Sequence, residues 1–494
     1  MGVSRTFRLL LIPLWSVQGG VMARDEPDFG LAMTHLELNL DLDHDRGSLA
    51  GSASYRIANL GDVPVQDVSF NLGRLMTVES VRLGGNGVGR DGGGRELVFT
   101  QAIDVFADSP RRQVNHVVVV LPSPLEPGDE VWLRAEYGGF LVGYTETGSI
   151  YIQDRVVWNP LIPYLEDGRF SILRTDAFAW PVMGTLHARA NRVAPRPDFT
   201  FRAAITVPEA FTVASSGRLV RQETQDGRTE FVYESTHPVP FLNLPIAEYA
   251  VLQRVGVRVY HFPADSAGAA RVLDAATDGL DLLARWFGTL GLEPDVVVME
   301  IPETWGSQAS LAGGIIQTAD AFGEDASLSP LYHELSHLWN APDLDQPSAR
   351  WNEGLATFLA HRMSDALDGS AGMDAAVEST ADRLLATVSR SPTLKSVPFA
   401  EYGEVEATDL SYGVGFLMFY ALESALGRET LDSVLRGFYQ DHKDRGWTFE
   451  GLAEELQAQT SQDLSGFIED WILTTAWFDQ LQAGVPPHRI GLNR

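Results

Sequence analysis

The stretch His333-Glu334-Leu335-Ser336-His337 decides how this chain is interpreted, because an HExxH sequence ties residue type closely to one chemistry. On a helix, residues four apart share a face, so the two imidazoles can bind one zinc ion together. Glu334 then lies beside the metal, where a carboxylate acts as general base toward a water molecule. The stretch therefore predicts a hydrolytic zinc site. Taken alone, it is also compatible with a chance match on a surface helix.

The composition describes the chain that carries this stretch. Its 494 residues, 45% of them hydrophobic, are enough for two or three domains with large cores. Lys and Arg number 37 against 66 Asp and Glu, and the formal net charge of −29 disfavours nucleic acid and anionic membranes as partners. A neutral or cationic substrate fits better. The simpler explanation of the acidity is that it keeps an exported protein soluble.

The sequence contains no cysteine, so disulfides and thiolate metal sites are excluded and any metal must be held by His, Asp or Glu. At the N-terminus, Arg5 and Arg8 precede the apolar run Leu9 to Val17 and small residues up to Ala23, a pattern typical of a secretory signal. We therefore expect residues 1–23 to be a signal peptide and the protein to be exported, periplasmic or extracellular, in a bacterial setting. A wrongly assigned start codon is the alternative. The sequence predicts no stable membrane span.

Hydrophobic residues alternate with polar ones in the first half, and this pattern predicts an antiparallel β-rich domain over residues 24–255. Leu36, Leu38, Leu40 and Leu42 alternate with polar side chains, as a half-buried strand requires. Further strand-like runs are Val117 to Leu121, Phe199 to Val207 and Glu230 to Tyr233. The glycine-rich segment Gly84 to Gly94 is interpreted as a hairpin loop, because no helical pattern follows it.

The period becomes helical near Pro263, so we expect a second domain over residues 256–480 and a tail over 481–494. Apolar residues from Ala270 to Phe287 form one helical stripe that ends at Gly288. Short strands are expected at Asp295 to Ile301 and Gly314 to Thr318. Helices are expected at the HExxH stretch, Trp351 to Met363, Gly413 to Leu426 and Thr448 to Leu473. The fold class is multi-domain α+β.

A catalytic zinc ion of this kind requires a third protein ligand. A metzincin arrangement would place Gly and His where this chain has Asn340 and Asp343, so Asp343 remains only a weak alternative. Glu353 is the better candidate, because it opens the next amphipathic helix. The intervening prolines, Pro342 and Pro347, allow the chain to fold that helix back against the first.

The combination of His333 to Asn340 with Trp351-Asn352-Glu353-Gly354 resembles the gluzincin metallopeptidases of the aminopeptidase N and leukotriene hydrolase type. The resemblance implies that Glu353 completes a site for one zinc ion. It further implies a saddle-like N-terminal β-domain and a thermolysin-like, mainly helical zinc peptidase domain. Fifteen residues separate His337 from Glu353 here, a shorter connection than in the family pattern.

The sequence Ser411-Tyr412-Gly413-Val414-Gly415-Phe416 resembles the Tyr-x-x-Gly helix start of the same family. There the tyrosine hydroxyl stabilises the oxyanion formed during peptide hydrolysis, so the resemblance assigns this role to Tyr412. Tyr402 is the fallback. The resemblance covers most of the chain. The large helical C-terminal domain that many family members carry is not expected here.

The chain departs from the family pattern at the residue that would bind the N-terminal end of the substrate. Aminopeptidases of this family carry a Gly-x-Met-Glu-Asn segment, whose glutamate binds the free α-amine, but Leu311 stands at that glutamate's position. Gly313 and Gly314 still permit a substrate backbone to approach an edge strand. For the amine, the candidates that remain are Gln308, Glu300 and Glu303.

Together these features predict a zinc-dependent metallopeptidase, aminopeptidase-like by resemblance. An endo- or oligopeptidase without free-amine recognition is the alternative. A catalytically silent scaffold is the second, and the intact catalytic set argues against it. Hydrolysis of an epoxide, as in the leukotriene relative, has no residue here that supports it. The expected partner is a peptide or protein substrate, and no sequence feature sets an oligomeric state.

Overall fold

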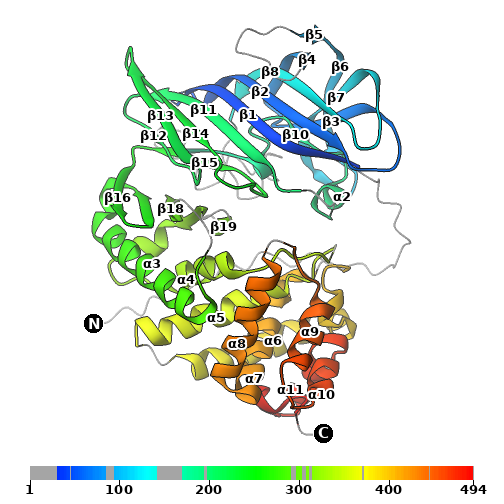
Figure 1. Cartoon of the computed structure of the whole chain (residues 1–494), viewed down its shortest axis with the longest axis vertical. Helices are drawn as coiled ribbons and strands as arrows, with labels where there is room; N and C mark the ends of the chain where they lie inside the picture. The colour runs from blue at the N-terminus through cyan, green and yellow to red at the C-terminus, as the bar shows by residue number, and fades with distance from the viewer. Residues whose placement is uncertain are drawn as a thin grey trace.

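The structure is a computed structural model. It describes residues 30–44, 46–84, 94–141, 170–193, 197–290, 296–302, 307–310, 314–345, 347–369, 372–405, 407–443 and 445–492. Strands dominate the first half of the chain and helices the second, and the two parts lie one above the other in Figure 1. This order confirms the predicted multi-domain α+β class. The predicted signal segment, residues 1–23, lies outside the described residues.

The alternating segments of the first half form a large twisted sheet, because each strand has one apolar face to bury. In sheet order, the strands are β13 (Arg218–Gln225), β14 (Arg228–Glu234), β11 (Thr200–Pro208), β1 (Leu31–Asp43), β2 (Ser48–Asn59), β8 (Glu130–Phe140), β4 (Met76–Gly84) and β5 (Arg95–Glu96). One pairing departs from the predicted antiparallel pattern, since β1 and β11 run parallel. Their partners on either side, β2 and β14, are antiparallel to them.

Two smaller sheets cover and extend the large one. One consists of β10 (Val182–Met183), β3 (Val65–Leu72), β7 (Ser109–Leu125) and β6 (Val98–Phe106), and the other of β12 (Thr212–Val213), β15 (Asn243–Ala247) and β9 (Phe170–Arg174). Leu36 and Tyr55 from the large sheet share one core with Phe70 and Val119 from the β3–β7 pair. A short helix, α2 (Ala188–Val193), lies beside them.

The second part of the chain begins with its own sheet. Its strand order is β16 (Ala250–Arg254), β17 (Val257–His261), β18 (Val296–Ile301), β20 (Gly314–Thr318) and β19 (Gln308–Ser310). The domain boundary predicted at residues 255 and 256 falls inside the β16–β17 hairpin, and both of these strands belong to this sheet. The helix α3 (Ser266–Phe287) packs on β17, and Gly288 follows its last residue. Leu273, Ala276, Leu283 and Phe287 of the predicted stripe are buried, whereas Ala270 is exposed.

Helices build the rest. They are α4 (Ser329–Ser336), α5 (Trp351–Leu367), α6 (Met373–Arg390), α7 (Ser411–Leu426), α8 (Arg428–His442), α9 (Phe449–Ala458), α10 (Ser465–Ile468) and α11 (Ala476–Gln482). In the predicted tail, the turn Pro487–Arg489 contacts α7, and Ile490 is buried in the helical core. Within the described ranges no single helix is long and apolar enough to cross a membrane; one pair, Thr408–Leu426 with Arg428–His442, meets that test jointly but is bent by 119°.

Candidate metal centre

The HExxH stretch lies at the end of a short buried helix. Leu331, Tyr332 and Leu335 of α4 face the core, so the opposite side of the helix carries the histidines toward the site. The α-helix ends at Ser336, and His337 opens a 3₁₀ turn instead of continuing the predicted helix. The backbone of His337 stays right-handed helical at φ −62° and ψ −22°. The two imidazole rings therefore remain neighbours, with centroids 4.8 Å apart.

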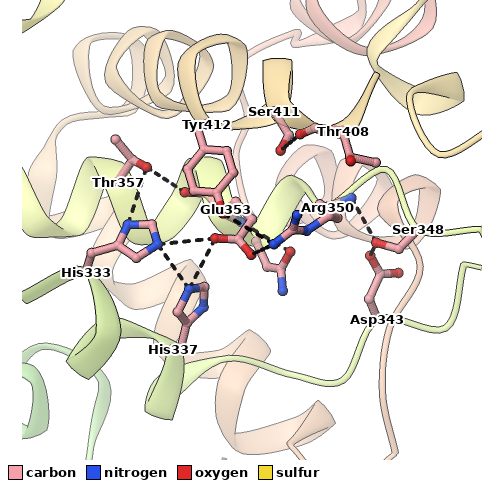
Figure 2. A network of polar contacts seen from close by, with 11 residues as sticks. His333, His337, Asp343, Ser348, Arg350, Glu353, Thr357, Thr408, Ser411 and Tyr412 are labelled. Carbon is pink, nitrogen blue, oxygen red and sulfur yellow. Dashed lines mark hydrogen bonds and ion pairs between the residues drawn. The ribbon is translucent and has the colours of Figure 1, made fainter. Parts of the chain in front are cut away.

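The third predicted ligand comes from α5. Trp351 is fully buried, stacks on Phe449 and contacts the edge of Phe438, and this packing anchors the first turn of α5. Glu353, two residues on, is 8% exposed and points at the histidines (Figure 2). In the part of the chain that the structure describes, His333, His337 and Glu353 are the one group of three such side chains whose ligand atoms converge.

The geometry of this group fits a zinc ion. Glu353 Oε2 lies 3.2 Å from His333 Nε2 and 3.3 Å from His337 Nε2, and the two Nε2 atoms lie 3.2 Å apart. Ligand atoms about 2.0 to 2.1 Å from a tetrahedral zinc ion lie about 3.3 to 3.4 Å from one another. The three atoms therefore match one face of the coordination tetrahedron. Two nitrogens and one carboxylate oxygen are also the donor set of a catalytic zinc site.

A threonine outside the predicted set of site residues fixes the tautomer of His333. Thr357 Oγ1 donates to the carbonyl oxygen of Glu353 at 2.8 Å and lies 3.4 Å from His333 Nδ1. Because the hydroxyl proton is used on the carbonyl, the Thr357 oxygen accepts from Nδ1–H. His333 Nε2 then keeps its lone pair for a metal, as zinc-ligating histidines require. The sequence feature that could have identified Thr357 is its spacing, since it follows Glu353 by one helical turn and so lies on the same face of α5.

The site is buried, and its charges depend strongly on one another. Burial opposes ionisation of Glu353, but hydrogen bonds with His333 and His337 lower its pKa well below the ordinary range. Burial raises the pKa of Glu334, which is 7% exposed and accepts a hydrogen bond from the backbone of Ala309. A carboxylate that is both ionisable and poorly solvated is suited to accept a proton.

Tyr412 reaches the same place from α7. Its ring stacks on His333 with centroids 5.8 Å apart, and burial and nearby Glu353 raise the pKa of its hydroxyl, so it stays protonated at neutral pH. Two glycines allow this approach. A Cβ on Gly354 would lie 2.4 Å from the Cα of Gly415, so the backbones of α5 and α7 touch there. The contact lies one residue after Glu353 and three after Tyr412.

Comparisons with solved structures identify the fold of this chain. An M1 zinc metallopeptidase from Deinococcus radiodurans matches with a TM-score of 0.60 and 20% identity, over 90% of this chain and 94% of that one. A mutant M1 zinc metallopeptidase from the same organism, bound to the substrate Tyr-Ser-Ala, matches equally well. The chain has the fold of the M1 zinc metallopeptidases. A mutant two-domain M1 zinc metallopeptidase bound to L-arginine also matches, with a TM-score of 0.58 and 20% identity over 92% of this chain and 94% of that chain.

No model of a known protein family matches the sequence, and no curated protein matches it. At 20% identity the likeness to the solved structures is one of fold. It confirms the predicted resemblance to this family at the level of the fold. The M1 fold also explains why β-rich and helical parts follow one another in this order.

Within this M1 fold, the two fallback residues lie elsewhere. Asp343 accepts hydrogen bonds from Ser348 Oγ at 2.5 Å and from the Asp345 N–H at 2.9 Å, and it is not a member of the converging group. Burial raises the pKa of Asp343 to about 6. Tyr402 is 1% exposed and packs against Phe399, with ring centroids 5.0 Å apart. Asp343 therefore holds a loop, and Tyr402 fills the core.

The residues predicted to bind substrate meet the N-terminal domain. Gln308 Oε1 accepts from Arg174 Nη2 at 3.2 Å and from Asn243 Nδ2 at 3.3 Å. A Cβ on Gly314 would lie 2.5 Å from Cβ of Ser216, so this glycine permits contact between the two domains. Gly313, Leu311 and Glu303 lie outside the described residues.

Glu300, a candidate for binding the substrate amine, is enclosed in the core. Its side chain is fully buried, and Oε2 accepts from the Phe262 N–H at 2.6 Å. Burial raises its pKa to about 9, so the carboxyl is neutral at physiological pH. A neutral, enclosed carboxyl does not bind a substrate ammonium group, so Glu300 is not the amine ligand.

Proposed function

We propose that this chain is a zinc-dependent metallopeptidase that hydrolyses peptide bonds. The observation that carries the proposal is the near-equilateral triangle of His333, His337 and Glu353 ligand atoms, with Glu334 and Tyr412 beside it. A protein without catalytic duty has no physical need for this set. The M1 fold supports the proposal, and one of its solved relatives was captured with the tripeptide Tyr-Ser-Ala.

Zinc held by His333, His337 and Glu353 would supply Lewis-acid chemistry, polarising a carbonyl and acidifying water. The residues of the chain do the rest. Glu334 takes a proton from the attacking water, and later returns it to the amine that leaves. Tyr412 donates its hydroxyl proton as a hydrogen bond to the oxyanion that forms in between. Burial of Glu334 favours both transfers, because the proton is held near the reacting atoms.

The edge strand β19 supplies a place for the peptide backbone. Among the described residues it is the last strand of its sheet, so it offers an edge to which a strand could be added. The backbone of Ala309, in this strand, hydrogen-bonds to Glu334. A peptide added along β19 would therefore run past the proposed general base.

The resemblance to aminopeptidase N predicts that the enzyme removes N-terminal residues, but two features favour cleavage that does not need a free amine. Leu311 replaces the amine-binding glutamate. Gln308 Oε1 already accepts from two donors, and a carbonyl oxygen has two lone pairs, so it has none left for an ammonium group. We propose endo- or oligopeptidase activity as the second candidate.

Metal analysis and turnover together test the proposed function. The purified protein should contain about one zinc ion per chain and cleave a fluorogenic peptide. Glu334→Gln should keep the zinc and lose turnover, because only the proton acceptor is removed. Glu429→Gln, at an exposed position in the first turn of α8, is the matched control and should behave as wild type. A fully active Glu334→Gln variant, or a protein without zinc, would refute the proposal.

The two candidates for substrate are separated by a peptide series with free and acetylated N-termini. Similar kcat/KM for both forms supports cleavage without amine recognition. Cleavage confined to the free peptides, one residue at a time, supports the aminopeptidase instead.

A further inference from the structure

Arg350 occupies an unusual place beside the proposed catalytic residues. It directly precedes α5, and its backbone is left-handed, with φ 56° and ψ 40°. Residues other than glycine adopt this conformation rarely, and it persists only where the surroundings fix it. Arg350 belongs to no motif that the sequence shows.

A short chain of hydrogen bonds fixes this conformation. Ser348 Oγ donates to Asp343 Oδ2 at 2.5 Å and accepts from the N–H of Arg350 at 2.8 Å. Asp343 lies opposite Trp447 in an isolated parallel bridge, which ties the loop to the segment before α9. The loop between the two halves of the metal site is thus anchored at both its start and its end.

The side chain of Arg350 joins two of the proposed catalytic groups, as Figure 2 shows. Its Nη2 donates to Glu353 Oε1 and, at 3.3 Å, to the hydroxyl oxygen of Tyr412. The guanidinium carbon lies 5.6 Å from the centre of the Tyr412 ring. Glu353 thus uses one oxygen toward Arg350 and the other toward the histidines.

The chemistry of guanidinium gives these contacts a direction. Arginine has only donors, so the hydroxyl oxygen of Tyr412 must accept. The proton of that hydroxyl then points away from Arg350, and the hydroxyl hydrogen-bonds to the Glu353 side chain, from which it can turn to an oxyanion at the metal site. A positive charge held against the hydroxyl oxygen also makes the phenol a better hydrogen-bond donor.

We propose that Arg350 is a positioning residue for peptide hydrolysis. It holds the Tyr412 hydroxyl and Glu353 Oε1 at fixed positions relative to each other. The tyrosine hydroxyl is thereby oriented to donate its proton as a hydrogen bond to the oxyanion. This role rests on the proposed peptidase function. Arg350 reaches the oxyanion only through the Tyr412 hydroxyl, so in zinc-loaded protein its loss should lower kcat only while Tyr412 has that hydroxyl.

A double-mutant cycle in the full-length, zinc-loaded protein tests this role. The variants are Arg350→Gln, Arg350→Lys, Tyr412→Phe and the Gln/Phe double variant. Arg390→Gln is the matched control, because Arg390 is exposed and donates to Ala386 and Thr387 of its own helix. Zinc content and the midpoint of thermal unfolding are measured first. The readouts are kcat and KM on a fluorogenic peptide and the Kd of a phosphinic pseudopeptide, whose tetrahedral oxyanion resembles the intermediate.

Arg350→Gln should lower kcat by about 10- to 100-fold with KM changed less than about 3-fold, and should weaken phosphinate binding by a similar factor. Arg350→Lys should recover part of both losses. In the Tyr412→Phe background, Arg350→Gln should change either quantity by less than about 3-fold.

Additive losses, or an Arg350→Gln variant that unfolds at lower temperature with unchanged kcat, would overturn the positioning role and leave the peptidase function intact. A wild-type protein that neither cleaves peptides nor binds the phosphinate would instead remove the proposed function, and this role with it.

Discussion

The contact between Gly354 of α5 and Gly415 of α7 allows a strong test of how the site is built. A Cβ on residue 354 would lie 2.4 Å from the Cα of Gly415 and 2.7 Å from the carbonyl oxygen of Ser411. Both are backbone atoms that cannot rotate away. Ordinary contact begins at 3.4 Å, so Gly354→Ala must move the two helices apart by about 1 Å.

This shift acts on catalysis more than on folding. Overpacking a core costs about 1 to 3 kcal/mol, while alanine in place of glycine returns about 1 kcal/mol of helix propensity. The net loss of about 0 to 2 kcal/mol leaves the protein folded. Glu353 and Tyr412 would separate by a similar distance, and a displacement of about 1 Å can lower the rate about 100-fold. We therefore expect Gly354→Ala to lower kcat/KM about 100-fold.

The assay is kcat/KM on a fluorogenic peptide, with zinc content and thermal unfolding measured in parallel. Gly437→Ala is the matched control, since this glycine is exposed on α8 and an added Cβ would meet nothing within 4 Å. It should keep full activity. Gly415→Ala, whose Cβ would lie 2.7 Å from the Cα of Gly354, should reproduce the loss. A folded Gly354→Ala protein with kcat/KM within about 3-fold of wild type would refute the reasoning.

Three further predictions address single groups. Tyr412→Phe should lower kcat far more than it raises KM, because the hydroxyl serves the oxyanion, and an unchanged kcat would return Tyr412 to a packing role. Thr357→Val should weaken zinc binding about 10- to 100-fold in a chelator competition, since it releases the tautomer of His333, and unchanged affinity would contradict this. Burial raises the pKa of Glu300 to about 9 from an ordinary 4.5, so the folded state retains a proton that the unfolded state loses. The free energy of unfolding should therefore fall as pH rises between these values, less steeply in Glu300→Gln, and equal slopes in a denaturant series would count against the assignment.

Local patterns predicted the elements well where one periodicity dominated. The strand over Gly314 to Thr318 has the predicted bounds, and the helix that was predicted to end at Gly288 does so. The pair of ligands His333 and His337 could be predicted from their spacing along one helix alone. Glu353 was favoured because it opens the next amphipathic helix, and resemblance then supported it. Tyr412 came from resemblance alone, because no local rule states that α5 and α7 meet.

The missed features depend on contacts between distant segments. The parallel pairing of β1 with β11 joins residues far apart in sequence, and alternation alone does not give strand direction. Glu300 was one of three candidates to bind the amine in place of Leu311, yet only the packed fold shows that its side chain is fully buried and accepts from the Phe262 N–H. Arg350 was missed because its backbone has a positive φ, and a non-glycine residue in that conformation cannot be recognised from the sequence.

The short connection between His337 and Glu353 shows which constraints matter for the site. Its length does not place Glu353, because α5 is placed by Trp351 in the core and by Gly354 against α7. The connection must only deliver the chain to the start of α5 in the correct direction. The left-handed turn at Arg350, held by Ser348, achieves this, and the same turn aims the guanidinium at Glu353 and Tyr412. Loop length can therefore vary in this fold while the catalytic geometry is retained, provided that the last residues of the loop make this turn.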